Sequence, residues 1–239
     1  MKLLNIVVLL IFTFCIKICY FIVQKISMAY HGTMNRNEAI EKLQNIIGED
    51  LVELANQYGI TLFKNTNKNK GWVGHIVEYH LGLPINSLQS PDFGDWELKT
   101  VSMKKLKSGI IVPKETMAIT MINAEHVINT DFEQSHLKSK LDKLLVISRM
   151  WYATTEPKSE LLDAFLFNIE TDIELYEEIK ADYEETRECL KTKGFSCLTG
   201  KMGKWIQPRT KGQGNGAPIT RAFYARTSFV KKIMQLENQ

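Results

Sequence analysis

Cysteine is scarce in this sequence and shows no metal-binding pattern. Only four of the 239 residues are cysteine, namely Cys15, Cys19, Cys189 and Cys197. None of them forms a CxxC pair and none has a cluster of histidines beside it, which excludes the common signatures of zinc sites. Because the spacing also shows no disulfide framework, we expect a protein without disulfides from a reducing compartment.

Net charge, repeats and low-complexity segments are also nearly absent. Lys and Arg outnumber Asp and Glu by only 30 to 27, an excess too small to indicate a nucleic-acid partner by itself. No internal repeat and no linker divides the chain. Since 44% of the residues are hydrophobic, we expect one packed domain over residues 35–239.

One long apolar run stands at the N-terminus. Residues 3–23, LLNIVVLLIFTFCIKICYFIV, approach the length of a bilayer span but contain a lysine. The residues that follow offer a poor cleavage site for a secretory signal. Three interpretations of residues 1–27 therefore stay open. They are a membrane anchor, an uncleaved signal-like sequence, or an upstream stretch that is not part of the protein because the true start is Met28 or Met34 rather than Met1. We expect a cytoplasmic protein, with membrane anchoring by residues 3–23 left open.

Positive charge gathers at the C-terminal end. From position 201 onward there are eight basic residues and a single acid, Glu237. This basic tail is the candidate surface for a polyanion.

Hydrophobic spacing predicts helices and strands in mixed order, and therefore an α/β domain around a central sheet. Strands are expected where β-branched and alternating residues occur, and helices where apolar residues recur at helical spacing. The expected elements are two short helices within 36–58 that break at Gly48, a buried helix ending at Gly82, a strand over 95–103, a strand or hairpin over 110–122, a helix leading into a buried strand at 144–151, a strand over 161–169, a long acidic helix over 172–194, and a final strand and helix within 220–236.

Acids and a lysine occur together in PDFGDWELKT, residues 91–100. Side chains alternate along an extended strand, so Glu97 and Lys99 point to the same side. Asp92 lies just upstream, close enough for its carboxylate to meet that of Glu97, and Asp95 is the alternative. Two such carboxylates repel each other unless a cation lies between them, and Mg²⁺ takes oxygen ligands of this kind.

Magnesium at this position can polarise a scissile phosphate, and Lys99 can orient or activate the attacking water. The structural alternative is an exposed charge pair on an edge strand. Glu78 raises the same question, because it lies on an otherwise largely apolar helix. A buried carboxylate is costly unless it is paired or belongs to a site.

These motifs resemble the MutH family of DNA endonucleases, which also contains GATC-cutting type II restriction enzymes. The likeness is carried by NKGWVGHIVEYHLG and PDFGDWELKT, and continues through FEQSHLKSKLDKLLVISR and RAFYARTSFVKKIM. It spans about residues 35–234 in the family's order. The resemblance implies a restriction-endonuclease-like fold, in which a mixed central sheet flanked by helices carries a PD-(D/E)xK site.

By this resemblance Asp92, Glu97 and Lys99 are the catalytic trio. Magnesium is then held by the two carboxylates and the carbonyl of Leu98. The gap of four residues between Asp92 and Glu97 is shorter than in MutH itself, which leaves the choice between Asp92 and Asp95 open.

The resemblance also assigns three residues outside this strand. Glu78 matches an additional acid that the family carries on a helix. Lys140 matches a further active-site lysine, and Lys70 matches a lysine near the DNA backbone.

The segment WIQPRTKGQGNGAP, residues 205–218, resembles the family's base-reading loop. Arg209 and Lys211 can donate to guanine edges or to phosphates, and Gln207 can pair with adenine. Tyr224 is expected near the groove. The alternative is a basic loop that touches only phosphates.

The resemblance implies a magnesium-dependent, sequence-specific endonuclease that cleaves double-stranded DNA to 5′-phosphate and 3′-hydroxyl ends. Residues 103–127 look more like the restriction branch, which cuts both strands and needs a second active site, usually by forming a homodimer. The alternative is a monomeric mismatch-repair nickase that acts at hemimethylated GATC and is stimulated by MutL. The competing class is a non-catalytic module that is tethered to a membrane or binds DNA.

Overall fold

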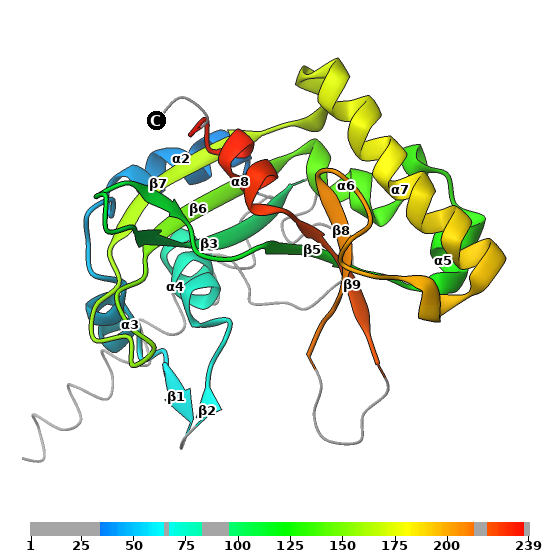
Figure 1. The fold of residues 1–239 in the computed structure, drawn as a ribbon. Coiled ribbons are helices and arrows are strands. Elements are labelled where there is room, and N and C mark those ends of the chain that lie inside the picture. The colour runs from blue at the N-terminus through cyan, green and yellow to red at the C-terminus, as the bar shows by residue number, and fades with distance from the viewer. Residues whose placement is uncertain (1–33, 65–66, 83–95, 213–218, 237–239) are drawn as a thin grey trace, which may run out of the picture.

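The computed structural model describes residues 34–64, 67–82, 96–212 and 219–236. A four-stranded sheet in the order β4-β3-β6-β7 forms the centre of this part of the chain (Figure 1). Strands β3 and β6 are parallel and the other neighbours are antiparallel, so the sheet is mixed. The strands are β3 (Glu97–Lys105), β4 (Ile111–Pro113), β6 (Leu144–Met150) and β7 (Leu161–Phe167).

The central strand β6 contributes side chains to two hydrophobic clusters, one on each face of the sheet. Every residue of its sequence LLVISRM is buried, as expected for a strand with neighbours on both sides and helices on both faces. Leu144 and Val146 enter one hydrophobic cluster, whereas Leu145 and Ile147 enter the other. The alternation of side chains along one strand therefore contributes to both cores.

Helices cover both faces of the sheet (Figure 1). One cluster is formed with residues of α2, α3 and α4, and the other with residues of α6, α7 and α8. This arrangement confirms the expected α/β class with a mixed central sheet flanked by helices. The helices are α2 (Arg36–Gln44), α3 (Leu51–Tyr58), α4 (Trp72–Leu81), α6 (His136–Asp142), α7 (Ile173–Lys193) and α8 (Thr227–Ile233).

A three-stranded antiparallel sheet lies beside the central one, in the order β5-β9-β8. Its strands are β5 (Met117–Met121), β8 (Ile206–Thr210) and β9 (Arg221–Ala225). The short elements that complete the described chain are β1 (Phe63–Lys64), β2 (Asn67–Lys68), α5 (Ala124–Asn129) and the 3-10 turns η1 (Phe132–Gln134), η2 (Ile169–Thr171) and η3 (Phe195–Cys197).

The segment 110–122 differs from the expected single strand or hairpin. It forms two strands that belong to different sheets, since β4 pairs with β3 and β5 pairs with β9. Strand β4 ends at Pro113, which has no N–H to continue a ladder. The base-reading segment likewise begins as strand β8 instead of a loop.

A disulfide joins Cys189, near the end of α7, to Cys197 in η3. The expectation that the cysteines form no disulfide is therefore wrong for this pair. The helix ends at Gly194, whose φ of 72° allows the chain to reverse in a conformation that favours glycine. This reversal brings two cysteines together that are eight residues apart in sequence.

No helix within the described ranges is long and apolar enough to cross a membrane. Residues 1–27, on which the anchor and start-site hypotheses rest, lie outside those ranges.

Candidate active site

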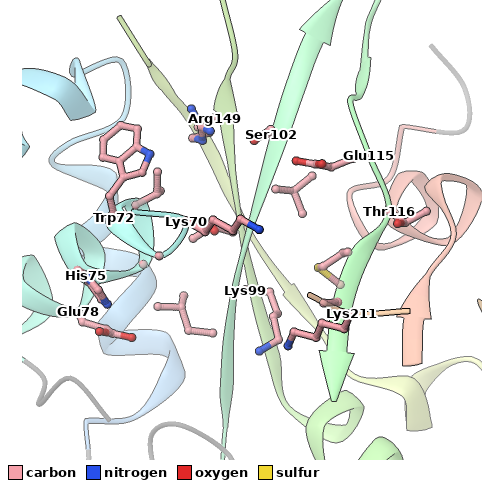
Figure 2. Close-up of a pocket in the computed structure, with 18 residues that line it drawn as sticks. Lys70, Trp72, His75, Glu78, Lys99, Ser102, Glu115, Thr116, Arg149 and Lys211 are labelled. Carbon is pink, nitrogen blue, oxygen red and sulfur yellow. The ribbon is translucent and has the colours of Figure 1, made fainter. Parts of the chain in front are cut away.

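A cavity of about 690 Å³ lies beside β3. Its walls come from the first turns of α4, from residues 98–102 of β3, from residues 115–118 and from Lys211. In Figure 1 the β1–β2 hairpin, which lies below α4, and the lower ends of β8 and β9 point in the same direction. Figure 2 shows Lys70, Lys99 and Lys211 among the side chains that line the cavity.

At the edge of this cavity a buried carboxylate is held by two lysines. The side chain of Glu97 is fully buried, and Lys99 donates a hydrogen bond to its Oε1. The Nζ of Lys140 lies 2.9 Å from Oε1 and 3.0 Å from Oε2 of Glu97. Because a buried carboxylate without hydrogen-bond partners is costly, the two lysines stabilise Glu97 at this position.

The fold explains why these three side chains meet. Glu97 and Lys99 lie on the same side of β3, as the strand alternation predicted. Lys140 lies in the last turn of α6, directly before β6. Since β3 and β6 run parallel with Glu97 opposite Leu144, the end of α6 is brought next to the start of β3. Strand alternation accounts for the first pair, whereas sheet pairing accounts for the contact with Lys140.

Lys211 extends this cluster of positive charge. It follows β8, and its N–H donates to the carbonyl of Thr220 at 3.0 Å, which continues the pairing with the β9 side. Although the residue as a whole is exposed, the pKa of Lys211 is lowered, first because protein desolvates its ammonium and then because Lys99 and Lys140 repel it. Lys99 and Lys211 also line the same cavity.

The opposite wall of the cavity comes from α4 and the two residues before it. Glu78, His75 and Lys70 all line the cavity (Figure 2). Glu78 therefore lies at the pocket rather than in the core, and its role in a site stays a prediction. His75 was not expected there, yet it lies three residues before Glu78, a spacing that places both side chains on one face of a helix.

Three of the expected DNA-binding residues lie on neighbouring strands of the three-stranded sheet. Tyr224 stands opposite Gln207 in β8 and opposite Ala118 in β5. The guanidinium of Arg209 lies 5.6 Å from the centre of the Tyr224 ring and donates to Thr116 Oγ1 at 2.7 Å. Burial raises the pKa of Tyr224, and the positive charge of Arg209 opposes this rise.

These residues differ in how far they are available for contact. Gln207 is only 5% exposed, whereas Arg209 is exposed. Ala118 and Thr116 line the cavity, so the row that contains Tyr224 reaches its rim. The structure thus brings Arg209 and Tyr224 together beside the pocket, and it keeps Gln207 largely covered.

The donor set around the cavity suits a hard cation. The carboxylates of Glu97 and Glu78 and the main chain of Leu98 supply oxygen atoms, which Mg²⁺ prefers. Asp92 and Asp95 lie outside the described residues. Among the residues that are described, no group of three histidine, cysteine or acidic side chains could hold a metal ion, so the expected ligand set rests on Asp92 as well.

Comparisons with known proteins found relatives that match most of this chain. A family model described as DNA mismatch repair enzyme MutH matches residues 81–182. The DNA mismatch repair protein MutH of Vibrio cholerae strain O395 is 30% identical over 213 residues, which cover 84% of this chain and 95% of that protein. The protein of the same name from Vibrio campbellii is 29% identical over 210 residues, covering 82% and 92% respectively.

Among solved structures, the restriction endonuclease MvaI in complex with its cognate DNA substrate aligns over 84% of this chain and 97% of that one. The alignment has 14% sequence identity and a TM-score of 0.38.

The relatives match nearly their whole length, and the match includes the strand with Glu97 and Lys99 and the helix with Lys140. The chain therefore belongs to the MutH family of DNA endonucleases, as its motifs predicted.

Proposed function

We propose that this chain hydrolyses phosphodiester bonds of double-stranded DNA at a specific sequence, with Mg²⁺ as its cofactor. The observation that carries the proposal is the buried carboxylate of Glu97, held by Lys99 and Lys140 at the edge of a cavity lined by further lysines. Such a cavity attracts a polyanion, and the two lysines hold the carboxylate in place. A charge pair on an exposed edge strand would not be buried in this way.

We assign the metal to Asp92, Glu97 and the carbonyl of Leu98, with Glu78 as a further acid. When bound, Mg²⁺ supplies a Lewis acid that polarises the scissile phosphate and lowers the pKa of a bound water. Lys140 holds the carboxylate of Glu97 in place through both of its oxygens.

Lys99 has a different role from Lys140. Lys99 lines the cavity and its side chain is 20% exposed, whereas Lys140 is only 5% exposed. Lys99 is therefore the lysine that can orient the attacking water and stabilise the negative charge that develops on the phosphate. Lys140 acts through Glu97.

The remaining cations bind and position the DNA. Lys70 and Lys211 stand on opposite walls of the cavity (Figure 2), where they can each neutralise a phosphate. Arg209 and Tyr224 at the rim, with Gln207 beside them, are the residues that we assign to base recognition. Arg209 is the strongest of these, since it is exposed and already oriented by Thr116.

Two modes of cutting remain, and the relatives favour one of them. The similar proteins from Vibrio species carry the name DNA mismatch repair protein, which supports a nickase at hemimethylated GATC that acts with MutL. The restriction mode, favoured by residues 103–127, requires cleavage of both strands and usually a homodimer.

The test is cleavage of unmethylated, hemimethylated and fully methylated plasmid by the wild-type chain and by Lys99→Ala, with and without Mg²⁺. We expect Mg²⁺-dependent cleavage by the wild type and at least about a 100-fold slower reaction in the variant. DNA binding by the variant should change little, because the lost interaction belongs to the transition state.

The products separate the remaining alternatives. Nicks confined to unmethylated strands, and faster with MutL, support the mismatch-repair mode. Linear DNA with discrete ends, together with dimers in sedimentation, supports the restriction mode. Absence of Mg²⁺-dependent cleavage on every substrate would leave the non-catalytic module that binds DNA or is tethered to a membrane.

A further inference from the structure

Arg149 is a buried cation in the wall of the proposed DNA-cleaving cavity. It belongs to β6, whose other residues are mostly apolar, and it is 7% exposed. Figure 2 shows Arg149 and Trp72 near each other at one end of the cavity, away from Lys99 and Lys211. An arginine in such a place either binds a DNA phosphate or serves the structure of the wall.

The hydrogen bonds of Arg149 decide between these roles. Its Nη1 and Nη2 donate to the two carboxylate oxygens of Glu156 at 2.8 and 3.0 Å. Nη1 also donates to Ser159 Oγ at 2.8 Å. Glu156 is 2% exposed and Ser159 is fully buried. The charge of Arg149 is thus matched inside the protein by a two-pronged pair, which leaves little of it for a phosphate.

The backbone of Glu156 supports a role for this pair. Its φ is 48°, a left-handed conformation that is uncommon for a residue other than glycine. Such conformations carry strain and persist only where the surroundings hold them. The two hydrogen bonds from Arg149 help to hold the carboxylate of Glu156 in this position.

The other face of Arg149 contacts α4. Its guanidinium carbon lies 5.3 Å from the ring centre of Trp72, the first residue of that helix. The helix begins at Gly71 without a hydrogen bond from a capping side chain, so its start depends on other contacts. A planar guanidinium fixed by Glu156 gives the Trp72 ring a flat surface against which to pack.

We infer that Arg149 is a positioning residue for the wall of the active site, and not a DNA-binding residue. Held by Glu156, it sets the first turn of α4 through Trp72. Lys70 directly precedes that turn and Glu78 follows it on the same helix, so the positions of both relative to Lys99 depend on Arg149. The inference rests on the proposed endonuclease function.

The main test replaces the whole ion pair by apolar residues in the full chain, as Arg149→Met/Glu156→Leu. Removing both charges leaves no unpaired buried ion, so the variant should fold with a melting temperature near that of the wild type. We expect the single-turnover cleavage rate at saturating DNA to fall by about 10- to 100-fold, because misplacement of a wall residue weakens catalysis strongly. The dissociation constant for DNA and its dependence on salt should stay unchanged.

A second variant, Arg149→Lys, keeps the buried charge but loses the planar fork and the flat face over Trp72. We expect the cleavage rate to fall by a comparable factor, while the dependence of DNA affinity on salt again stays unchanged. If Arg149 instead binds a phosphate, the slope of log affinity against log salt falls by about one in the double variant. That result, or a double variant that cleaves at the wild-type rate, would overturn the inference.

The matched control is Arg187→Met/Glu184→Leu, an arginine–glutamate pair on α7 with Nη1 3.2 Å from Glu184 Oε2. None of its residues lines the cavity, so cleavage and binding should match the wild type. If the wild-type chain itself shows no cleavage with Mg²⁺, the proposed function fails, and this outcome is distinct from failure of the role assigned to Arg149.

Discussion

The ammonium group of Lys140 contacts both carboxylate oxygens of Glu97, a residue 43 positions earlier in the chain. Both side chains are buried, and the contact joins the end of α6 to the start of β3. This contact gives the glutamate a fixed orientation before any metal or DNA binds. It also predicts how the site responds when the lysine is removed.

Lys140→Met should weaken both stability and cleavage. Glu97, which is buried, then loses the cationic partner that contacts both of its oxygens, so the free energy of unfolding should fall by roughly 1–3 kcal/mol. The cleavage rate should fall by at least about 100-fold. Urea denaturation and single-turnover cleavage measure the two effects.

The control for Lys140 is Lys180→Met, which removes an ion pair with Glu133 on the surface of α7. Its stability and cleavage rate should remain those of the wild type. Equal behaviour of the two variants would show that the Lys140–Glu97 contact has no special role.

Affinity for DNA should fall at alkaline pH because of Lys211. Its pKa lies below the ordinary value of 10.5, so the ammonium loses its proton, and its attraction for phosphate, at a lower pH than most lysines. Lys211→Arg keeps its charge at every pH reached here and should hold its affinity constant further into the alkaline range. Dissociation constants measured from about pH 7 to about pH 10 test this, and identical profiles for the two proteins would contradict it.

Acid should destabilise the protein through His136. The pKa of His136 is lowered from 6.5, first by burial and then by the positive charges of His126 and Lys140. The unfolded chain therefore takes up a proton at a higher pH than the folded chain does, and stability falls as the pH drops through 6.5 toward the lower folded value. The ring of His136 stacks on His126 with 4.2 Å between centres.

His136→Asn should lose less stability than the wild type on acidification, since the group that takes up the proton is gone. Urea denaturation at about pH 7.5 and about pH 5 measures the difference. A variant that loses as much stability as the wild type would place the acid sensitivity at another group.

Gly203→Ala should destabilise the segment that leads into β8. Gly203 has a φ of 74°, and a Cβ there would lie 1.8 Å from the carbonyl oxygen of Ile206. Asp182 holds the same segment by accepting hydrogen bonds from the N–H groups of residues 204–206. We expect the free energy of unfolding to fall by at least about 2 kcal/mol.

Gly59→Ala is the comparison for this prediction, because Gly59 has a similar φ of 69° but no atom within 4 Å of the added Cβ. In this variant the free energy of unfolding should fall by only about 1 kcal/mol, roughly the strain of the left-handed conformation alone. Thermal unfolding of the two variants separates the strain of the backbone from the collision with Ile206.

Local patterns in the sequence predicted most of the elements. The helical spacing before Gly82, the apolar run at 144–150 and the acidic helix over 173–193 appear where they were expected. These patterns are reliable because they depend on residues that are close together in the chain. Within the described residues, the same-side placement of Glu97 and Lys99 follows from strand alternation alone, and the motifs around them identified the family.

Contacts between distant segments came only from the tertiary structure. The sequence could not show that residues 110–122 divide between two sheets, that Cys189 meets Cys197, or that Arg149 is held by Glu156 under Trp72. Each depends on how strands pair and where the chain reverses, and many pairings satisfy the same local preferences. The sequence by itself indicated most of the element types and the family, and it supplied the candidate acids and lysines of the proposed site. Packing decided which of them meet, because burial and strand pairing act between residues far apart in the chain.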